Sequence, residues 1–570
     1  MSEKPVTVER IKSEYKKMVD YNTGINLYEN VKMNENFFIG KQWENVEANG
    51  LPTPVFNFLK RVTLFTVASI TSDNIKMKAS SMAASPIGGL PRAASIINNE
   101  FDRLFEFGKI PNKMREVMRN AAVDGDGVTY TYWNADVETG QPRKGAIVTE
   151  VIENTRIGFG NTADRRVQTQ PYILITHREM TDMLKDRAGE LGCGNLDSIK
   201  PDTDDTQPDA YKDLDQKTTV ILRLWKNRET GTVWACEATQ DVMIRRPWDL
   251  GIRLYPITWL NWDYIQDNYH GQAMIGGLIP NQVFINKMFA MSMLSMMTTA
   301  FPKVLYDGTR VKSWSNQVGT AIKVTGGDVN SVAKILDPAT ISPQISQFIE
   351  LAVDMTQSNL GATSVALGDT RPDNTSAIIA LQRAAATPNE ITKQNLYECI
   401  EDLGRIYIEF MAGYYGVRNV EADPPTTNEL PPEIQEFAAD SMPLNENGKI
   451  VLPFDFSALK GIPMSLKLDV GASSYWSEIA SVQTLDNLLM NKVISGTVYL
   501  KHLPEGYLAD RQGIINDIQA EMARVMVTPP GEQPQSDGTG VAKDNTPIES
   551  IPVRGGAGNG ELQRKLQETL

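Results

Sequence analysis

The sequence predicts an α+β protein built from several domains. Its 570 residues correspond to about three to four domains at roughly 150 residues each. Segments with a helical spacing of apolar residues surround segments rich in β-branched and aromatic residues, so both helices and sheets are expected. Hydrophobic residues make up 41% and charged residues 22%, which excludes a wholly disordered, collagen-like or disulfide-dependent chain.

Three helices are predicted in the N-terminal part. Apolar and aromatic residues recur at steps of three and four over 6–40, and similar runs follow over 57–72 and 93–123. The Ser, Ala, Pro and Gly residues of 81–92 predict a loop between the last two.

Strands are predicted next. Five segments are β-branched or aromatic and partly alternating: 128–133, 146–152, 172–175, 219–225 and 232–236. The Asp-rich stretch 196–217 predicts a solvated loop. These segments form the first β-rich body of the chain.

Two helices enclose a short glycine-punctuated strand region. The first is Met-rich and covers 277–300; Pro280 and several polar residues interrupt the apolar segment around it, which argues against a membrane span. The second begins at Ser342-Pro343, a cap followed by a first-turn proline, and carries an apolar stripe that includes Phe348 and Ile349. The region between them, 303–340, is predicted to contain short strands.

The C-terminal part returns to mixed structure. Residues 361–373 predict a polar loop. A helix that begins at 374 meets a second helix at Pro388. Pro388 belongs to the capping box Thr387-Pro-Asn-Glu390, and the second helix extends to Tyr415. The remaining predictions are short strands within 417–475, including 465–470, helices over 477–524, and a disordered tail beyond Thr528.

The sequence lacks the common motifs of catalysis and of cofactor or metal binding. There is no phosphate-binding GxxxxGK[ST] loop, no GxSxG motif, and no Cys/His spacing for zinc. Asp124-Gly-Asp-Gly127 lacks the rest of a calcium loop and predicts a turn before a strand, and His270 is interpreted as structural. We therefore expect no catalytic site, no cofactor and no metal.

Charge and cysteine content limit the partners and the compartment. The net charge of −14 gives the chain no general attraction for a phosphate backbone. Three scattered cysteines suit a reducing compartment, and the first residues lack the apolar core of a signal peptide.

The Met-rich helix predicts contacts between copies of the chain. The insert 303–340 has little core of its own, and two antiparallel helices could carry it at their far end, where neighbouring copies would stabilise it. Met288, Met291, Met296 and Met297 give this helix an adaptable surface. The alternative is a helix buried inside one domain.

Several motifs, taken in order, resemble the portal proteins of tailed bacteriophages over roughly 5–525. The motifs are Phe38-Ile-Gly-Lys-Gln-Trp43 followed by Pro54-Val-Phe-Asn57, the segment Gly271–Asn286, the helix 342–360 followed by a loop and Thr375–Leu381, and the segments Val482–Leu489 and Tyr499–Gly506. Each motif is weak alone, and the order makes the set specific.

The resemblance implies a multidomain portal-type subunit with the following parts: wing 1–270, stem helix 271–300, clip 301–341, stem helix 342–360, tunnel loop 361–373, kinked wing helix 374–415, second wing part 416–475, crown 476–528 and disordered tail 529–570. It also implies a dodecameric ring at one vertex of the virion capsid, assembled in the host bacterial cytoplasm. Double-stranded DNA would pass along its axis during packaging and ejection.

The implied partners are other proteins of phage assembly, with no membrane. They are the large terminase ATPase, which would supply the packaging work that this chain cannot, the head-tail adaptor, and the major capsid and scaffolding proteins. Twelve copies at −14 each would repel DNA from the channel wall and let it pass.

Candidate site residues follow from this reading. The tunnel-loop set is Thr363, Leu367, Asp369, Thr370 and Arg371; the clip set for DNA or motor contact is Lys303, Lys312, Trp314 and Lys323; the stem set is Met288, Met291, Phe348 and Ile349. Each cation has the alternative of a solvated surface charge. Other readings of the chain are an adaptor or baseplate component without a DNA channel, and an enzyme whose site is not visible in the sequence.

Overall fold

The computed structural model describes residues 5–44, 46, 47, 50, 52–72, 75–81, 90–204, 216–300, 304–313, 315, 322–328, 332–335, 344–359, 389–422, 450–460, 464–470, 475–491, 493–503, 513–515 and 518. The chain divides into two compact units, Met1–Ile479 and Ala480–Leu570. The described elements are both helical and extended, so the predicted α+β class is confirmed.

The N-terminal helices contain breaks that the sequence analysis did not predict. The single helix expected over 6–40 is wrong: α1 (Val8–Gly24) and α2 (Leu27–Ile39) are separated at Asn26, whose φ of 55° lies in the left-handed region. Asparagine tolerates this conformation better than most residues. The helix expected over 57–72 is confirmed as α3 (Phe58–Ile70).

A second break divides the helix expected over 93–123. The two helices are α4 (Leu90–Phe107) and α5 (Ile110–Asp124), and Lys109 between them has a φ of 50°. A Cβ atom on Gly108 would lie 2.6 Å from the carbonyl oxygen of Leu104, so glycine is required there. Pro111 then stands in the first turn of α5, where its missing N–H costs no hydrogen bond.

Five antiparallel strands form the larger sheet, in the order β4-β5-β6-β7-β8. Their bounds are β4 (Ile157–Phe159), β5 (Ile173–Met180), β6 (Lys217–Lys226), β7 (Val233–Ala238) and β8 (Met243–Asp249). Helix α1 packs on this sheet with Ile11, Tyr15 and Met18, and helix α6 (Thr181–Glu190) packs on it in a separate apolar cluster with Leu184 and Ala188. The strands predicted over 172–175, 219–225 and 232–236 are confirmed, whereas β4, β8 and α6 were missed.

A three-stranded sheet, β3-β2-β9, lies in the main core. It comprises β2 (Asp126–Asn134), β3 (Ala146–Ile152) and β9 (Ile257–Asn261); the first two confirm predicted strands. Helices α5 and α10 (Glu390–Phe410) pack against this sheet, and α10 continues as a π-helical turn, Met411–Tyr415. The predicted end of that helix at Tyr415 is confirmed, while the kink at Pro388 lies outside the described residues.

Short strands from distant parts of the sequence complete the first unit. β1 (Ile75–Ser81) pairs with β14 (Met464–Val470), and β12 (Val417–Ala422) pairs with β13 (Ile450–Asp455), both antiparallel. The 3-10 turns are Asn154–Arg156, Val167–Thr169, Leu196–Ser198 and Phe456–Leu459. Strand 465–470 was predicted from the sequence, but its partner β1 was not.

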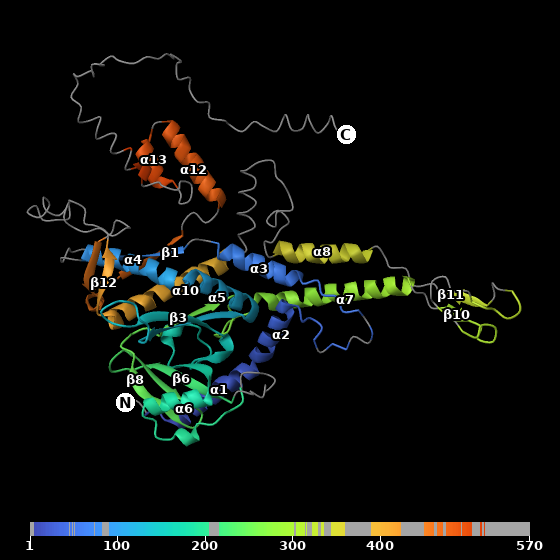
Figure 1. The fold of residues 1–570 in the computed structure, drawn as a ribbon, viewed down its shortest axis with the longest axis horizontal. Helices are drawn as coiled ribbons and strands as arrows, with labels where there is room; N and C mark the ends of the chain where they lie inside the picture. The colour runs from blue at the N-terminus through green and yellow to red at the C-terminus, as the bar shows by residue number, and fades with distance from the viewer. Residues whose placement is uncertain are drawn as a thin grey trace, which may run out of the picture. The chain divides into compact units, whose positions relative to one another are not determined.

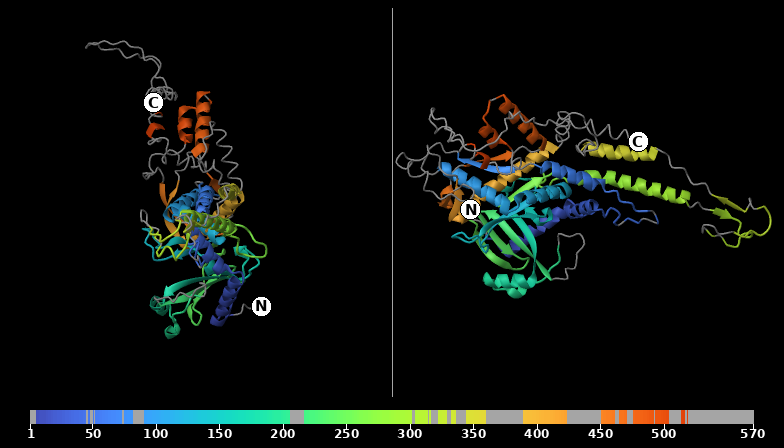
Figure 2. Two further views of the ribbon diagram at one scale, coloured as in Figure 1. Left: turned by 90° about the vertical axis from the view of Figure 1, so that its right-hand side faces the viewer. Right: turned by 45° about the horizontal axis from the view of Figure 1, so that its top comes forward.

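A small antiparallel hairpin stands between two helices in the chain (Figure 1), and the short strands predicted within 303–340 are confirmed. Helix α7 (Met274–Ala300) leads to β10 (Val304–Tyr306), which pairs with β11 (Ala333–Ile335), and α8 (Gln344–Asn359) returns along α7. Figures 1 and 2 both show α8 lying beside α7.

The second unit contains most of α12 (Tyr475–Met490), which starts in the first unit, and α13 (Gly496–His502). The Tyr499 hydroxyl donates to Asp486 at 2.7 Å and joins the two helices. Both helices were predicted within 477–524. Throughout the described chain, no helix combines the length and apolarity needed to cross a membrane.

Candidate functional site

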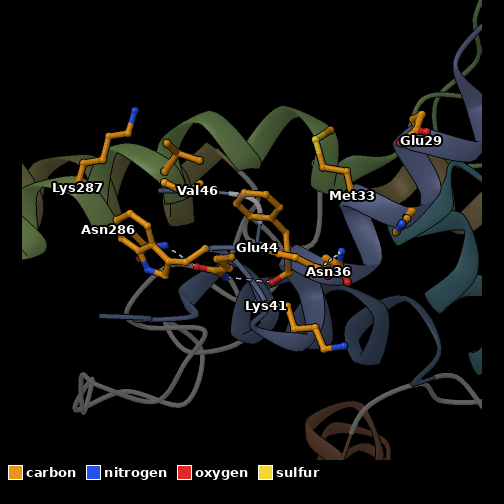
Figure 3. A pocket seen from close by; sticks show the side chains of 13 residues that line it. Glu29, Met33, Asn36, Lys41, Glu44, Val46, Asn286 and Lys287 are labelled. Atoms are coloured by element: carbon orange, nitrogen blue, oxygen red, sulfur yellow. Dashed lines mark hydrogen bonds between the residues drawn. The ribbon is translucent and has the colours of Figure 1, made fainter. Parts of the chain in front are cut away.

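The base of α7 is held by a buried network of amide side chains. Asn286 Nδ2 donates to Gln42 Oε1 at 2.6 Å (Figure 3). Gln282 Nε2 donates to Asn286 Oδ1 at 3.0 Å. All three side chains are buried. Amide groups removed from water must find partners inside the protein, so this network fixes how α7 leaves the main core.

The same network reaches the helix before it in the sequence. Gln282 Nε2 also donates to the carbonyl oxygen of Phe56 at 2.8 Å, and the backbone N–H of Leu59 donates to Gln282 Oε1 at 3.3 Å. The Leu59 N–H belongs to the first turn of α3, where backbone N–H groups have no partner within the helix itself. Gln282 therefore joins the start of α3 to α7.

Asn57 and Trp43 hold the loop that surrounds this network. Asn57 Nδ2 donates to the carbonyl oxygen of Phe38 at 2.9 Å, and Asn57 Oδ1 accepts from the backbone N–H of Lys60 as the cap of α3. Trp43 Nε1 donates to the carbonyl oxygen of Pro54 at 2.9 Å. The structure thus brings together three separate motifs: Phe38–Trp43, Pro54–Asn57 and the beginning of α7.

A second buried node lies immediately before α7. Asp126 Oδ1 accepts from Asn261 Nδ2 and from the backbone N–H of Gly271, each at 2.7 Å, and Asp126 Oδ2 lies 2.6 Å from His270 Nδ1. The His270 ring contacts Tyr269. Burial raises the pKa of Tyr269 well above its ordinary value. Helix α5 ends at Asp124 and β2 begins at Asp126, so the Asp124-Gly-Asp-Gly127 motif contains the turn before a strand that was predicted.

Helices α7 and α8 contact each other directly. Asn281 Nδ2 donates to Thr356 Oγ1 at 3.1 Å, and Thr356 is buried between the two helices. The chain direction reverses between them, because α7 leads toward the hairpin and α8 returns from it. This pair and the β10–β11 hairpin are described parts of the predicted helix–insert–helix unit.

The far half of α7 presents methionines to the surface. Met291, Met296 and Met297 are 53%, 66% and 55% exposed, whereas Met274 and Ile275 at the start of the helix belong to the main core. The alternative of a helix buried along its length inside one domain is therefore wrong for this chain. A row of exposed methionines is a surface that needs a partner.

The hairpin is held by a small number of local contacts. The backbone N–H of Thr309 donates to Asp307 Oδ1 at 2.9 Å, and its hydroxyl donates to the same atom. Both hydrogen bonds lower the pKa of Asp307, and the bond from the Thr309 hydroxyl has the larger effect. Arg310 Nε lies 3.6 Å from Asp307 Oδ2. Val311 and Val332 are the buried apolar residues among those described in the insert. The core formed by the described residues of the insert is therefore small.

The structure describes some of the predicted site residues and places the stem set on two neighbouring helices. Met288 and Met291 lie on α7, and Phe348 and Ile349 lie on the neighbouring α8, with Phe348 57% exposed. Lys312 and Lys323 are exposed in the insert. The other predicted residues lie outside the described part: Lys303, Trp314, Thr363, Leu367, Asp369, Thr370 and Arg371.

Sequence reasoning missed the amide network at the base of α7. Gln282 and Asn286 are four residues apart in a mostly apolar helix, which puts them on one face. That spacing was the available signal, but nothing in the sequence identifies Gln42 as the partner. Among the residues that the structure describes, no group of three or more His, Cys, Asp or Glu side chains is arranged to hold a metal.

Comparisons with known proteins give one family. Residues 176–420, less than half of the chain, match the family model described as phage P22-like portal protein. No curated protein matches the chain. The matched region covers most of the large sheet, both helices α7 and α8 with their hairpin, and α10. The predicted resemblance is thereby confirmed, and the match supports a phage portal protein family for this chain.

Proposed function

We propose that this chain is the subunit of a ring at one capsid vertex, and that double-stranded DNA passes along the axis of this ring during packaging and ejection. The main observation in support is the pair α7 and α8, which exposes Met291, Met296 and Phe348 while carrying the hairpin. These residues would be covered by neighbouring copies, since burial of apolar side chains in water drives association.

The proposed parts follow the order of the chain. Residues 271–300 and 342–360 form the stem, 301–341 the clip, and 361–373 the tunnel loop. Residues 1–270 and 416–475 form the wing, 374–415 the long wing helix and 476–528 the crown. The family match supports this order, because α7, the hairpin and α8 all lie inside it.

The net charge of the chain suits a conduit. A ring of copies that each carry −14 repels a polyanion and so keeps it from adhering to the wall. Local contacts to phosphate would come from Arg371 in the tunnel loop and from Lys303, Lys312 and Lys323 in the clip. The clip, with Trp314, would also seat the large terminase ATPase and later the head-tail adaptor. The major capsid and scaffolding proteins would surround the ring in the virion.

The first experiment is negative-stain microscopy and sedimentation velocity on the purified full chain. We expect rings with a central hole wide enough for duplex DNA. Replacing Met296 with Lys should weaken assembly, because a charge would then be buried between copies. Met183→Lys is the matched control, since Met183 is 60% exposed on α6, away from the proposed stem. A chain that stays monomeric, or assemblies without a hole as in an adaptor or baseplate, would contradict the proposal.

A second experiment separates assembly from DNA passage. Deletion of 363–370 should leave rings intact and reduce DNA packaging in a reconstituted system with the terminase. If rings fail to form, the loop is structural and its assignment to the tunnel is wrong. Trp314→Ala should leave rings intact and weaken terminase or adaptor docking; unchanged docking would remove Trp314 from that contact.

A further inference from the structure

A cleft of about 430 Å³ opens beside the amide network, between α2, the loop after it, and α7 (Figure 3). Its wall is partly apolar: Met33 is 43% exposed and Val46 is 50% exposed. Lys41 and Lys287 are exposed at its edge, and the described residues place no acidic partner on either of them. The cleft wall is therefore partly apolar, with Lys41 and Lys287 exposed on its rim, and Lys32, Glu29 and Glu44 also line it.

Helix α8 has the complementary character. Phe348, Leu351 and Met355 are 57%, 49% and 60% exposed and follow the three- and four-residue spacing of one helical face. Glu350 and Asp354 are exposed next to this stripe, four residues apart, and the described residues give neither carboxylate a cation. An apolar ridge bordered by two negative charges matches an apolar cleft bordered by two positive charges.

Helix α8 and the cleft lie on different sides of α7 in one subunit. Asn281 contacts α8, whereas Asn286 lies in the cleft wall. At 100° per residue these two positions differ by about 140° around the axis of α7. Figure 1 accordingly shows α8 on one side of α7 and α2 on another. Ridge and cleft thus form two different surfaces of one subunit, as a head-to-tail ring requires.

Building on the proposed function, we propose that the Phe348–Leu351–Met355 face of α8 in one copy docks into the α2–α7 cleft of the next copy. Asp354 then lies opposite Lys287, and Glu350 lies opposite Lys41. The occupant is a second copy because its charges and apolar spacing fit. A nucleic acid fits less well, because its phosphate backbone offers no apolar ridge to the exposed side chains of Met33 and Val46.

Charge reversal in the full chain tests this contact. Lys287→Glu and Asp354→Lys, each alone, should raise the protein concentration needed for half-maximal ring formation about tenfold or more. The double variant with both changes should recover most of the loss, because every interface in its ring regains an opposite pair. Lys16→Glu on α1 is the matched control and should leave assembly unchanged. Thermal melts recorded below the concentration of ring formation should be unaltered in all four variants, because these side chains are exposed in the single subunit.

Cysteine cross-linking gives a readout independent of charge. In a Cys193→Ser background, which removes the one described cysteine that is not buried, Met33→Cys combined with Met355→Cys should give a ladder of cross-linked oligomers under mild oxidation. Met355→Cys alone should give no ladder. A strong dimer from Met355→Cys alone would mean that α8 meets α8, and would overturn the inference.

Different results would overturn the α8–cleft contact and the proposed ring. Rings that form normally in both single charge variants would overturn the α8–cleft contact and leave the ring itself standing. A wild-type chain that forms no ring overturns the proposed function before the contact is tested. Binding of a short DNA duplex that Lys287→Glu abolishes, with ring formation unchanged, would assign the cleft to nucleic acid instead.

Discussion

Asn286 on α7 donates a hydrogen bond of 2.6 Å to Gln42, a residue 244 positions earlier in the chain, and both side chains are buried. The contact joins the loop after α2 to the helix that carries the exposed methionines. Since Gln282 extends the same network to α3, the direction of α7 depends on amide hydrogen bonds as well as on apolar packing.

Replacing Asn286 with Ala should destabilise the protein by about 1–3 kcal/mol. The substitution leaves Gln42 Oε1 buried without a donor, and the cost of such an unpaired group exceeds the gain from the hydrogen bond itself. Denaturant unfolding followed by circular dichroism would measure the change. Gln272→Ala is the control, because Gln272 is exposed just before α7, and it should change stability by less than about 0.5 kcal/mol.

A buried ion pair fixes α1 on the large sheet and leads to the second prediction. Glu14 Oε2 accepts from Arg223 Nε at 2.6 Å, and the Arg223 side chain is 2% exposed. Glu14→Ala would leave the guanidinium buried and uncompensated, which costs about 3–5 kcal/mol. Lys12→Ala on the same helix breaks the exposed pair with Asp241 and should cost under about 1 kcal/mol. Equal effects of the two substitutions would contradict the assigned role of the buried pair.

The third prediction concerns pH. Burial raises the pKa of Asp124 from its ordinary value of 3.8 to about 7, with Arg119 opposing the shift. The folded protein thus binds this proton more tightly than the unfolded chain, so Asp124 lowers stability progressively as pH rises from about 4 through 7. At roughly 1.4 kcal/mol per pKa unit, the upper bound on this loss is about 4 kcal/mol.

Asp124→Asn should therefore increase the melting temperature at pH 8 relative to the unmodified chain and have little effect at pH 4. Thermal melts at the two pH values would measure this difference. Asp136→Asn, at an exposed aspartate, controls for the change in net charge. A gain that is equal at both pH values would show that the effect does not come from the titration of Asp124.

The fourth prediction concerns the turn between α5 and β2. Gly125 has a φ of 99°, and a Cβ atom on it would lie 2.6 Å from the carbonyl oxygen of Gly271. Gly125→Ala should cost about 2–5 kcal/mol, from the left-handed backbone together with overpacking against the segment before α7. Gly192 has a φ of 77°, also in the left-handed region, and open space around it. Gly192→Ala should therefore cost about 1–2 kcal/mol. Urea unfolding of the two variants compares them, and a smaller loss for Gly125→Ala would contradict the close contact.

Local patterns predicted most of the elements on which the proposal depends. The Met-rich helix and the amphipathic helix after the insert appear as α7 and α8, because their apolar residues repeat with the period of a helix. The strands β2, β3, β5, β6 and β7 were predicted because β-branched and aromatic residues occupy them. The helix breaks at Asn26 and Lys109 were not predicted, since neither residue type requires a positive φ.

The sequence by itself determined that this chain is an α+β protein, which segments are helical or extended, and which family it resembles. Only the tertiary structure decided that Gln42 meets Asn286, that β1 pairs with β14, and that helices α8 and α2 lie on different sides of α7. The physical reason is that helical and strand periods are local properties of a few neighbouring residues. Hydrogen-bond partners and exposed surfaces depend instead on how segments that are hundreds of residues apart pack together.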